Sequence, residues 1–398
     1  MKIKLLLGFL YFLLVFSQPA NAGWQPVPDF GGGTREITTY FTLNNKGYAG
    51  CGRNNTGEKT DLWEFNGSSW TQKADYPGNG LISPAVFVIS NSAYVVCGYS
   101  ASTNSNSVWS YDQMSNSWSH KNDFPGLARY STIGFALNGD GYLTTGYGGS
   151  CLNDFWKYSV STDTWTQLSD FPGAARQHAS GAVANGKIYL GLGYNNGTSY
   201  NDWWVYDPGN TSWSQMTSFP GGARRGALTL YCVGKIFLGT GYNSTTYFND
   251  FWSYDPALDI WQPFDTLPSL SRYAPAGFAI SQCIYVGTGS YNGIFNPTSL
   301  SDMYRSCELN SIEENIYSNL TVSYSNTRNE LLIHSGFNNI HQLQVGIYTI
   351  GGKEVASHEL TFRNELTSLE LPSLPGGIYL YVLSAKSKSV KSGKIFLQ

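Results

Sequence analysis

The chain repeats one pattern of residues six times, at intervals of 46 to 52 residues. In each repeat an apolar run ends at a glycine, and a Trp with an aromatic residue two positions later follows. The glycines are Gly52, Gly98, Gly146, Gly193, Gly241 and Gly289. The first Trp is Trp63, Trp109, Trp156, Trp204 or Trp252, with Tyr304 in the sixth repeat, and a second Trp is Trp70, Trp118, Trp165, Trp213 or Trp261. A period of about 50 residues is typical of one blade of a β-propeller.

The phase of this pattern predicts how the propeller closes. An Arg stands eleven residues after the second Trp in four repeats, and Arg35 stands eleven residues after Trp24. Trp24 therefore marks the last strand of a blade whose other strands are missing at this end. Residues 272–304 supply three strands without a closing Trp. We predict six blades, with the segment at Trp24 pairing beside residues 303–305 so that no sheet edge stays open.

The repeated Gly and Trp positions resemble kelch repeats over residues 24 to about 308. The resemblance implies an all-β, six-bladed kelch-like β-propeller, which we assign to residues 23–310. After that point the Gly and Trp period stops, and short alternating runs continue at 331–334, 344–350, 378–383 and 394–397. These runs predict a small β-sandwich domain over residues 311–398.

Three segments of this second domain resemble the C-terminal sorting domain of the type IX secretion system of Bacteroidetes-type bacteria. They are VGIYTIGGKEV at 345–355, LPGGIYL at 374–380 and KIFLQ at 394–398. The usual Tyr-Pro-Asn-Pro opening is replaced by YSNL at 317–320, without either proline. The resemblance implies a partner, the type IX secretion machinery, which would contact residues 311–398. The alternative is a structural β-domain or a carbohydrate-binding module.

The N-terminal 22 residues predict a signal peptide. Lys2 and Lys4 precede an apolar span, and Ala20-Asn21-Ala22 fits a cleavage site for export. No later stretch approaches the roughly 18 apolar residues that a membrane span needs. Residues 23–310 hold 15 Lys and Arg against 20 Asp and Glu, which argues against nucleic acid as a partner. We expect a secreted or cell-surface protein, without a transmembrane segment in the mature chain and monomeric.

An Arg and an Asp also recur, and both are missing from the same repeat. Arg35, Arg129, Arg176, Arg224 and Arg272 stand seventeen residues before their glycines, where the second repeat has Leu81. Asp61, Asp154, Asp202, Asp250 and Asp302 precede the first Trp or its equivalent, where the second repeat has Ser107. The starts of the first and third strands lie at the same end of a blade, so we predict one Arg–Asp ion pair in each blade. The alternative is a ring of free Arg that binds anions.

Ligand specificity is expected where the blades differ. The residue after each Arg, or after Leu81, begins the innermost strand near the central channel, and the loops that leave the glycines begin with Tyr in four blades. From these positions we predict the ligand-binding residues Glu36, Tyr130, Gln177, His178, Arg225, Tyr273, Tyr99, Tyr147, Tyr194 and Tyr242. Tyr with neighbouring amides and hydroxyls offers stacking faces and neutral hydrogen bonds, which suit a glycan or a peptide. The alternative is that these Tyr are ordinary turn residues covering the blade edges.

The sequence favours a binding protein over an enzyme. It has no Gly-x-Ser-x-Gly, His-x-x-x-His or Cys-x-x-Cys motif, so we assign no catalytic residue, metal or cofactor. The predicted function is recognition of a glycan or protein ligand on the loop face. The alternative is a sugar-processing enzyme similar to the kelch-type sialic acid mutarotases or epimerases, which are six-bladed and exported. It would use Glu36 and Arg225 for acid–base chemistry, provided that the two converge in one pocket.

The six cysteines all lie in the repeats. Cys51 and Cys97 stand directly before their glycines and are expected to be small buried residues. Cys283 starts the second strand of the last blade and Cys307 ends its third strand, so the two should meet at one end. In an exported chain this placement predicts a Cys283–Cys307 disulfide.

Overall fold

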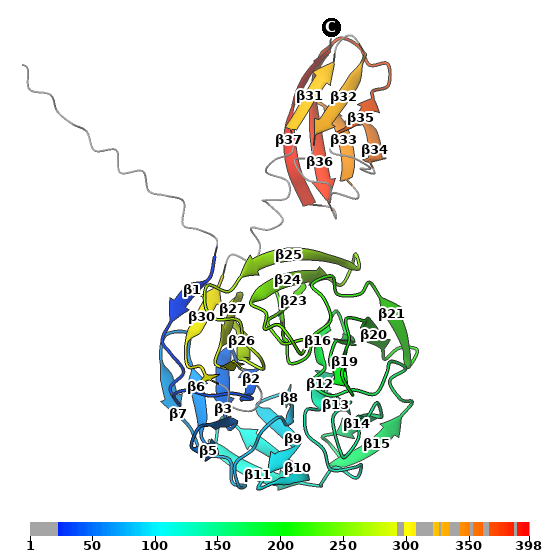
Figure 1. The fold of residues 1–398 in the computed structure, drawn as a ribbon. Helices are drawn as coiled ribbons and strands as arrows, with labels where there is room; N and C mark the ends of the chain where they lie inside the picture. Colours follow the sequence, from blue (N-terminus) through cyan, green and yellow to red (C-terminus); the bar gives the residue numbers. More distant parts are fainter. Residues whose placement is uncertain are drawn as a thin grey trace, which may run out of the picture. The chain divides into compact units, whose positions relative to one another are not determined.

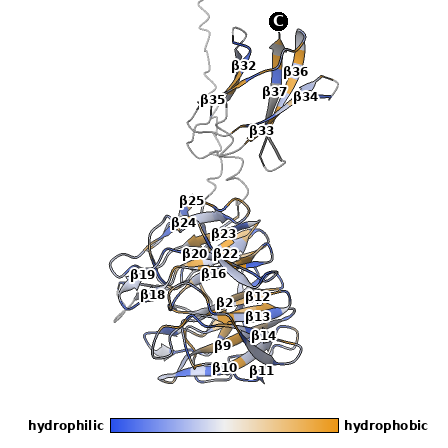
Figure 2. Cartoon of the chain, turned by 90° about the vertical axis from the view of Figure 1, so that its right-hand side faces the viewer, coloured by the Kyte–Doolittle hydropathy of each residue, from blue (hydrophilic) through white to orange (hydrophobic). Residues whose placement is uncertain are grey.

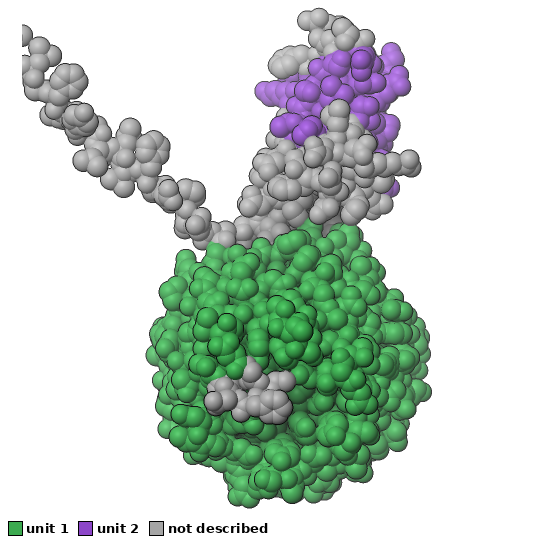
Figure 3. Space-filling view, viewed as in Figure 1, with its two compact units in different colours: residues 1–307 green, residues 308–398 purple. Residues whose placement is uncertain are grey.

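The computed structural model describes residues 23–292, 298–307, 321–325, 328–334, 343–350, 353–360, 366–385 and 388–397. The predicted signal peptide, residues 1–22, lies outside the described residues, as does the YSNL segment at 317–320. The chain forms two compact units, Met1–Cys307 and Glu308–Gln398 (Figure 3). Every regular element in the described ranges is a β-strand.

Unit 1 is a six-bladed β-propeller of four-stranded antiparallel sheets, as predicted (Figure 1). From the axis outward, blade 1 consists of β2 (Thr39–Leu43), β3 (Lys46–Gly50), β6 (Leu62–Phe65) and β7 (Trp70–Gln72). Blade 2 consists of β8 (Ala85–Ile89), β9 (Ser92–Ser100), β10 (Thr103–Asp112) and β11 (Ser117–Lys121). Blade 3 consists of β12 (Ile133–Leu137), β13 (Asp140–Thr144), β14 (Phe155–Ser159) and β15 (Thr164–Leu168). Blades 4 and 5 are β16 (Ser180–Ala184), β17 (Lys187–Gly191), β20 (Trp203–Asp207) and β21 (Ser212–Met216); and β22 (Leu228–Cys232), β23 (Lys235–Gly239), β24 (Asp250–Asp255) and β25 (Ile260–Thr266). The innermost strands contact one another around the axis.

Blade 6 closes the ring with both ends of the unit. It consists of β26 (Ala276–Ile280), β27 (Cys283–Gly287), β30 (Met303–Ser306) and the N-terminal β1 (Gln25–Val27). Strand β1 pairs antiparallel with β30, Gln25 opposite Arg305 and Val27 opposite Met303. Trp24 is only 8% exposed and packs against Phe251, with ring centroids 4.9 Å apart. The predicted closure is therefore confirmed, and the predicted Cys283–Cys307 disulfide is formed in the same blade.

The recurring glycines connect each blade to the next. Each glycine N–H donates a hydrogen bond of 2.7–2.9 Å to the carbonyl of the recurring Arg, or of Leu81, in the following blade, and Gly289 returns to Arg35. All six glycines have a positive φ between 70° and 109°. At Gly193 an added Cβ would lie 2.9 Å from the carbonyl oxygen of Gln177 in the first strand. Glycine is needed at these positions because a side chain would collide with the strand whose edge it approaches.

The predicted Arg–Asp pairs are present in the five blades that carry both residues. In blade 4, Arg176 Nη2 lies 2.7 Å from Asp202 Oδ2, and Arg176 Nη1 also donates to the carbonyl of Leu192 at 2.8 Å. The five Arg are at most 1% exposed. The alternative of free, anion-binding Arg is therefore wrong for this series, because each guanidinium is buried and bound within its own blade.

Blade 2 replaces the ion pair with a neutral cluster. Arg129 in blade 3 packs its guanidinium 4.9 Å from the ring of Phe124, and the equivalent aromatic position in blade 2 is Tyr76. The Tyr76 hydroxyl is hydrogen-bonded to Ser107, which stands at the Asp position, and the buried Leu81 stands at the Arg position. Losing the Arg and the Asp together leaves no unpaired charge, which explains why both are absent from one blade.

The recurring Trp residues are mostly partly buried. Only Trp261 of the two series is fully buried, and the centre of each core holds instead side chains such as Phe65, Tyr158 and Tyr254. In the four blades that carry both the first Trp and the Asp, the indole N–H donates to that carboxylate at the margin of the core. Trp156 Nε1 donates to the Asp carboxylate of its own blade at 2.7 Å, near solvent. The Trp rings thus flank the core rather than fill it.

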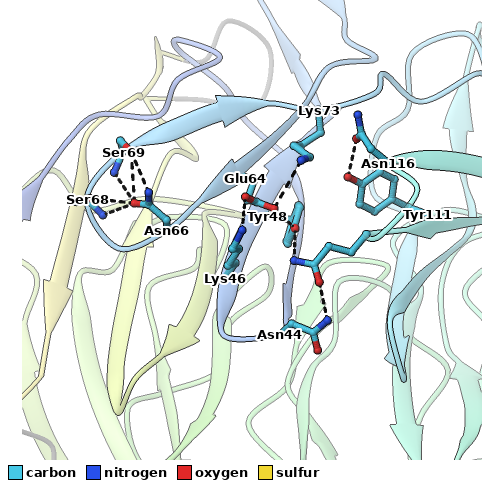
Figure 4. Close-up of polar contacts among 11 residues, drawn as sticks. Asn44, Lys46, Tyr48, Glu64, Asn66, Ser68, Ser69, Lys73, Tyr111 and Asn116 are labelled. Atoms are coloured by element: carbon cyan, nitrogen blue, oxygen red, sulfur yellow. Dashed lines mark hydrogen bonds and ion pairs between the residues drawn. The ribbon is translucent and has the colours of Figure 1, made fainter.

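At the end of the blades opposite the glycines, a buried carboxylate network joins blades 1 and 2 (Figure 4). Glu64 is 8% exposed, accepts a hydrogen bond of 2.7 Å from Lys46 Nζ and accepts another from the Tyr48 hydroxyl. Gln113 of blade 2 donates to the Tyr48 oxygen at 2.9 Å. Burial alone would raise the pKa of Glu64, but the bonds from Lys46 and Tyr48 and the nearby Lys73 outweigh it and lower the pKa. The network is a structural link between blades.

Unit 2 has two sheets that share one core. Their strand orders are β31 (Thr321–Ser325), β32 (Glu330–His334) and β35 (Leu366–Glu370), and β34 (Glu354–Leu360), β33 (Leu343–Thr349), β36 (Gly377–Ala385) and β37 (Lys388–Leu397). Leu331 and Ile333 from the first sheet are buried with Val345, Ile347 and Leu383 from the second. Figure 2 shows hydrophobic residues gathered on the strands of both units.

Candidate functional site

The two series of predicted ligand-binding positions meet at one end of the channel. In every blade the residue after the recurring Arg or Leu81 lies three positions before the innermost strand, not at its start as expected, and forms an isolated backbone bridge with the residue after the glycine. The six bridges are Glu36–Arg53, Ile82–Tyr99, Tyr130–Tyr147, Gln177–Tyr194, Arg225–Tyr242 and Tyr273–Ser290. We call these twelve residues the mouth ring. Nine of the ten predicted residues belong to it, and His178 lies one position further along the chain.

Side chains of the mouth ring interleave between neighbouring blades. The Tyr130 ring lies between Tyr147 of its own blade and Tyr99 of the preceding blade, with centroid distances of 5.6 and 5.5 Å. Arg225 has the same arrangement, since its guanidinium lies 5.4 Å from the Tyr242 ring and 4.0 Å from the Tyr194 ring. In both cases the side chain of the residue after the recurring Arg lies between the residues that follow two successive glycines.

The charged residues of the mouth ring are arranged differently from the expectation. Arg53 Nε donates to Glu36 Oε1 at 2.7 Å, and Glu36 is 3% exposed. The structure therefore pairs Glu36 with Arg53 of its own blade and not with Arg225. Arg225 is 8% exposed and contacts the faces of two Tyr. The proposed convergence of Glu36 and Arg225 fails because the Arg53 carbonyl and amide already bridge Glu36, which brings that guanidinium closer.

A cavity of about 360 Å³ lies within the mouth ring, and all six blades contribute to its lining. It is lined by Glu36, Ile37, Arg53, Ile82, Ser83, Tyr99, Tyr130, His178, Tyr247, Tyr273 and Ser290. Five predicted residues are among them, whereas Tyr147, Gln177, Tyr194, Arg225 and Tyr242 stand outside the lining. The cavity therefore separates the predicted set into an inner and an outer group.

The predicted set lacks four polar residues of this lining: Arg53, Ser83, Tyr247 and Ser290. Arg53 and Ser290 could have been found, because they occupy the position after the glycine that holds Tyr in the other four blades. No repeated position marks Tyr247. It is recognisable only from the structure, where its ring lies 4.5 Å from Tyr242 and 5.7 Å from Tyr291.

A second layer of residues follows the mouth ring toward the channel. The residues directly after the first-strand positions are Ile37, Ser83, Ser131, His178, Gly226 and Ala274, and all have φ between 48° and 59°. Backbone hydrogen bonds connect neighbouring blades at this level: Ser131 N donates to the Ser83 carbonyl at 2.9 Å, and His178 N to the Ser131 carbonyl at 3.1 Å. These bonds hold non-glycine residues in the left-handed region, which they enter rarely.

His178 is the titratable centre of this layer. Its Nε2 lies 2.9 Å from Ser131 Oγ and 3.0 Å from the Tyr273 hydroxyl. Removal from water, together with the charge of Arg225, lowers the pKa of His178 to about 3. Burial also raises the pKa of the Tyr273 phenol above its ordinary value. Both groups are therefore neutral at physiological pH, so the cavity offers an uncharged imidazole and a phenol.

No group of three or more His, Cys, Asp and Glu residues in the described part of the chain could hold a metal ion. Nor does that part contain a helix long and apolar enough to cross a membrane.

Comparisons with known proteins agree with the repeat pattern. The family model described as the KLHDC2/KLHL20/DRC7 Kelch-repeats domain matches residues 142–291, and the Kelch motif model matches residues 83–125. The model of the secretion system C-terminal sorting domain matches residues 323–398. The solved structure of YjhT is similar, with a TM-score of 0.60 and 16% identity, over 70% of this chain and 95% of that one. At this identity the likeness concerns the fold alone. No curated protein matches the chain.

Proposed function

Since the chain is a kelch-repeat protein that carries a secretion-system C-terminal sorting domain, we propose that it acts outside the cell by binding a glycan in the axial cavity. The sorting domain supports export through the type IX system to the cell surface. The nature of the ligand is inferred from the cavity alone, because propellers with one fold serve many functions.

The observation that carries the proposal is the composition of the cavity wall. Its volume of about 360 Å³ lies in the range of small-ligand sites. Four Tyr contribute to the wall, which are Tyr99, Tyr130, Tyr247 and Tyr273. Aromatic faces pack against the C–H faces of sugar rings, and the Glu36–Arg53 pair and His178 supply hydrogen bonds to hydroxyls. The Tyr rings would therefore stack on the sugar, and the polar side chains would fix its orientation.

The sequence prediction also allows a protein ligand, and the two groups of mouth-ring residues distinguish a protein ligand from a glycan. A stable protein interface buries about 800 Å² on each partner and would extend across the outer group of the ring. A small glycan would depend on the inner group only. Tyr130 and Tyr147 form a matched pair for this test, because their rings touch, yet only Tyr130 lines the cavity.

The experiment is a glycan-array screen of the mature protein, followed by titration of the strongest glycan against two variants. Tyr130→Ser removes a cavity wall and should weaken binding roughly tenfold, equivalent to about 1.4 kcal/mol of stacking and burial. Tyr147→Ser should leave affinity within about twofold. Equal losses in both variants, or no glycan bound by a folded protein, would reject a glycan site in the cavity.

A sugar-processing enzyme is the second candidate, and one observation favours it. The Glu36 carboxylate lines the cavity beside a guanidinium, that of Arg53. A carboxylate in such a place can take the proton of an anomeric hydroxyl. The test is anomer exchange followed by NMR with the intact protein and with Glu36→Gln. Loss of exchange in the variant supports the enzyme, and absence of exchange in the intact protein dismisses it.

Processing of the chain completes the proposal. We propose that the signal peptide is removed before Gly23, that the propeller spans residues 23–310, and that the type IX machinery contacts residues 311–398. N-terminal sequencing and the intact mass of the exported protein test these boundaries. A product that begins elsewhere than near Gly23 would refute the cleavage site.

A further inference from the structure

The backbone of His178 is fixed by both neighbouring blades. Its N–H donates to the Ser131 carbonyl of blade 3 and its carbonyl accepts from Gly226 N of blade 5, each at 3.1 Å. Its φ of 52° is the one shared by all six equivalent residues. The direction in which the imidazole leaves the backbone is therefore set by the ring of blades and not by the ligand.

The imidazole nitrogen Nε2 faces two hydroxyl groups at once. Ser131 Oγ lies 2.9 Å away and the Tyr273 hydroxyl 3.0 Å away. A neutral ring nitrogen carries either one proton or one lone pair, so it forms one good hydrogen bond of either kind. A phenol is more acidic than an alcohol, and therefore it is the stronger donor and the poorer acceptor. The stable arrangement has Tyr273 donating to the Nε2 lone pair.

This bond determines the tautomer of the neutral ring. With Nε2 as acceptor, the single proton of the imidazole is on Nδ1. Nδ1 has no hydrogen-bond partner among the described residues, and His178 lines the cavity. The N–H that remains is thus available to whatever enters the channel.

The surrounding charges keep the ring in this state. The ionisable groups that line the cavity together with His178 are Glu36 and Arg53 of blade 1, Tyr99 of blade 2, Tyr130 of blade 3, Tyr247 of blade 5 and Tyr273 of blade 6, and Arg225 of blade 5 acts on the ring from outside the lining. Arg225 acts on the imidazole directly, and its positive charge opposes a second proton. The imidazolium form is also disfavoured because it carries a proton on Nε2 as well as on Nδ1. The proton on Nε2 would meet the hydroxyl proton that Tyr273 donates.

From these contacts we propose that His178 is the specificity-determining hydrogen-bond donor of the cavity, presenting Nδ1–H in one fixed tautomer to an acceptor oxygen of the ligand. The identity of the ligand in this inference rests on the proposed function. The tautomer rests on the structure alone. Such an N–H donates to a carbonyl, ring or hydroxyl oxygen of a sugar. It disfavours a group that can only donate, such as the ammonium of an unacetylated amino sugar.

The test reads the tautomer without any ligand. Two-bond ¹H–¹⁵N spectra of the ¹⁵N-labelled protein, with His178→Gln to assign the signal, should show a protonated Nδ1 and an unprotonated Nε2 that do not change between pH 5 and 9. Tyr273→Phe removes the donor and should mix the two tautomers. Tyr99→Phe, which alters the same cavity, should not. A protonated Nε2, or a ring that titrates near pH 6.5, would overturn the proposal.

A binding arm completes the experiment. His178→Phe should weaken the strongest glycan of the array by up to about tenfold, the effect of one lost hydrogen bond. A glycan that binds the variant as tightly as the intact protein contradicts the donor role. If no glycan binds at all, the proposed function fails, while the spectra still decide whether the tautomer is fixed.

Discussion

The Cys283–Cys307 disulfide should stabilise blade 6, the blade that closes the propeller. In blade 6 the N-terminal strand β1 pairs with β30 through three residue pairs, Gln25 to Val27 against Met303 to Arg305. The disulfide joins the residue after β30 to the first residue of β27 and closes a loop of 24 residues. Loop-closure entropy for that length corresponds to about 3.4 kcal/mol. Since a domain of this size unfolds with roughly 0.6 kcal/mol/K of entropy, Cys283→Ser with Cys307→Ser should lower Tm by about 6 °C.

Thermal unfolding followed by circular dichroism measures this change. Cys151→Ser is the matched control, because Cys151 is a partly buried cysteine of the same unit that is not in a disulfide. It should shift Tm by less than 1–2 °C, as substitutions outside such features usually do. Reducing agent should reproduce the loss in the intact protein and add nothing in the double variant. A Tm unchanged by reduction, with the bond shown broken by mass spectrometry, would refute the reasoning.

Three other predictions concern single features of the propeller. Arg176→Leu should lower the free energy of unfolding by about 3–5 kcal/mol because it leaves the Asp202 carboxylate unpaired, and adding Asp202→Ser should recover part of that loss. A double-mutant cycle measured by urea unfolding tests this, and fully additive losses would argue against the pair. Gly193→Ala should cost more than about 1 kcal/mol in the same assay, because its φ is 98° and the new Cβ meets the Gln177 carbonyl; an unchanged midpoint would contradict this. The lowered pKa of His178, about 3 against 6.5 unfolded, means that the unfolded chain binds the extra proton first as pH falls. Between pH 6.5 and about 3, His178 should therefore lower stability by about 1.4 kcal/mol per pH unit, and His178→Gln should reduce the measured slope; equal slopes would show that His178 does not contribute.

The blade count and closure were predictable because they depend on spacing alone. Trp24 and Arg35 repeat the eleven-residue distance of the complete blades, and this places the N-terminal strand without any knowledge of contacts. The Arg–Asp pairs were predictable for a related reason. Strand topology brings the two residues to one end of a blade, and their joint absence at Leu81 and Ser107 indicates that they act together. Regular structure was thus inferred from regular sequence.

The cavity was only half predictable, because its lining depends on contacts between blades. Tyr147 and Tyr130 are equally prominent in the sequence, yet only Tyr130 reaches the axial cavity. Arg53 was overlooked because it breaks the Tyr series, although its bridge to Glu36 follows from the same register. The surroundings of His178 come from three other blades, since Ser131 and Tyr273 contact its Nε2 and Arg225, together with burial, lowers its pKa. No single repeat contains that information.

The mouth ring separates the needs of folding from those of recognition. Its bridges use backbone atoms: Glu36 N donates to the Arg53 carbonyl at 3.0 Å, and Tyr130 N to the Tyr147 carbonyl at 3.2 Å. A charged pair and an aromatic pair therefore satisfy the same backbone pattern. Side chains at these positions are consequently free to differ between blades, while the glycine behind them is not. Six similar blades can in this way surround one asymmetric cavity, with an ion pair on one side and Tyr rings on the others.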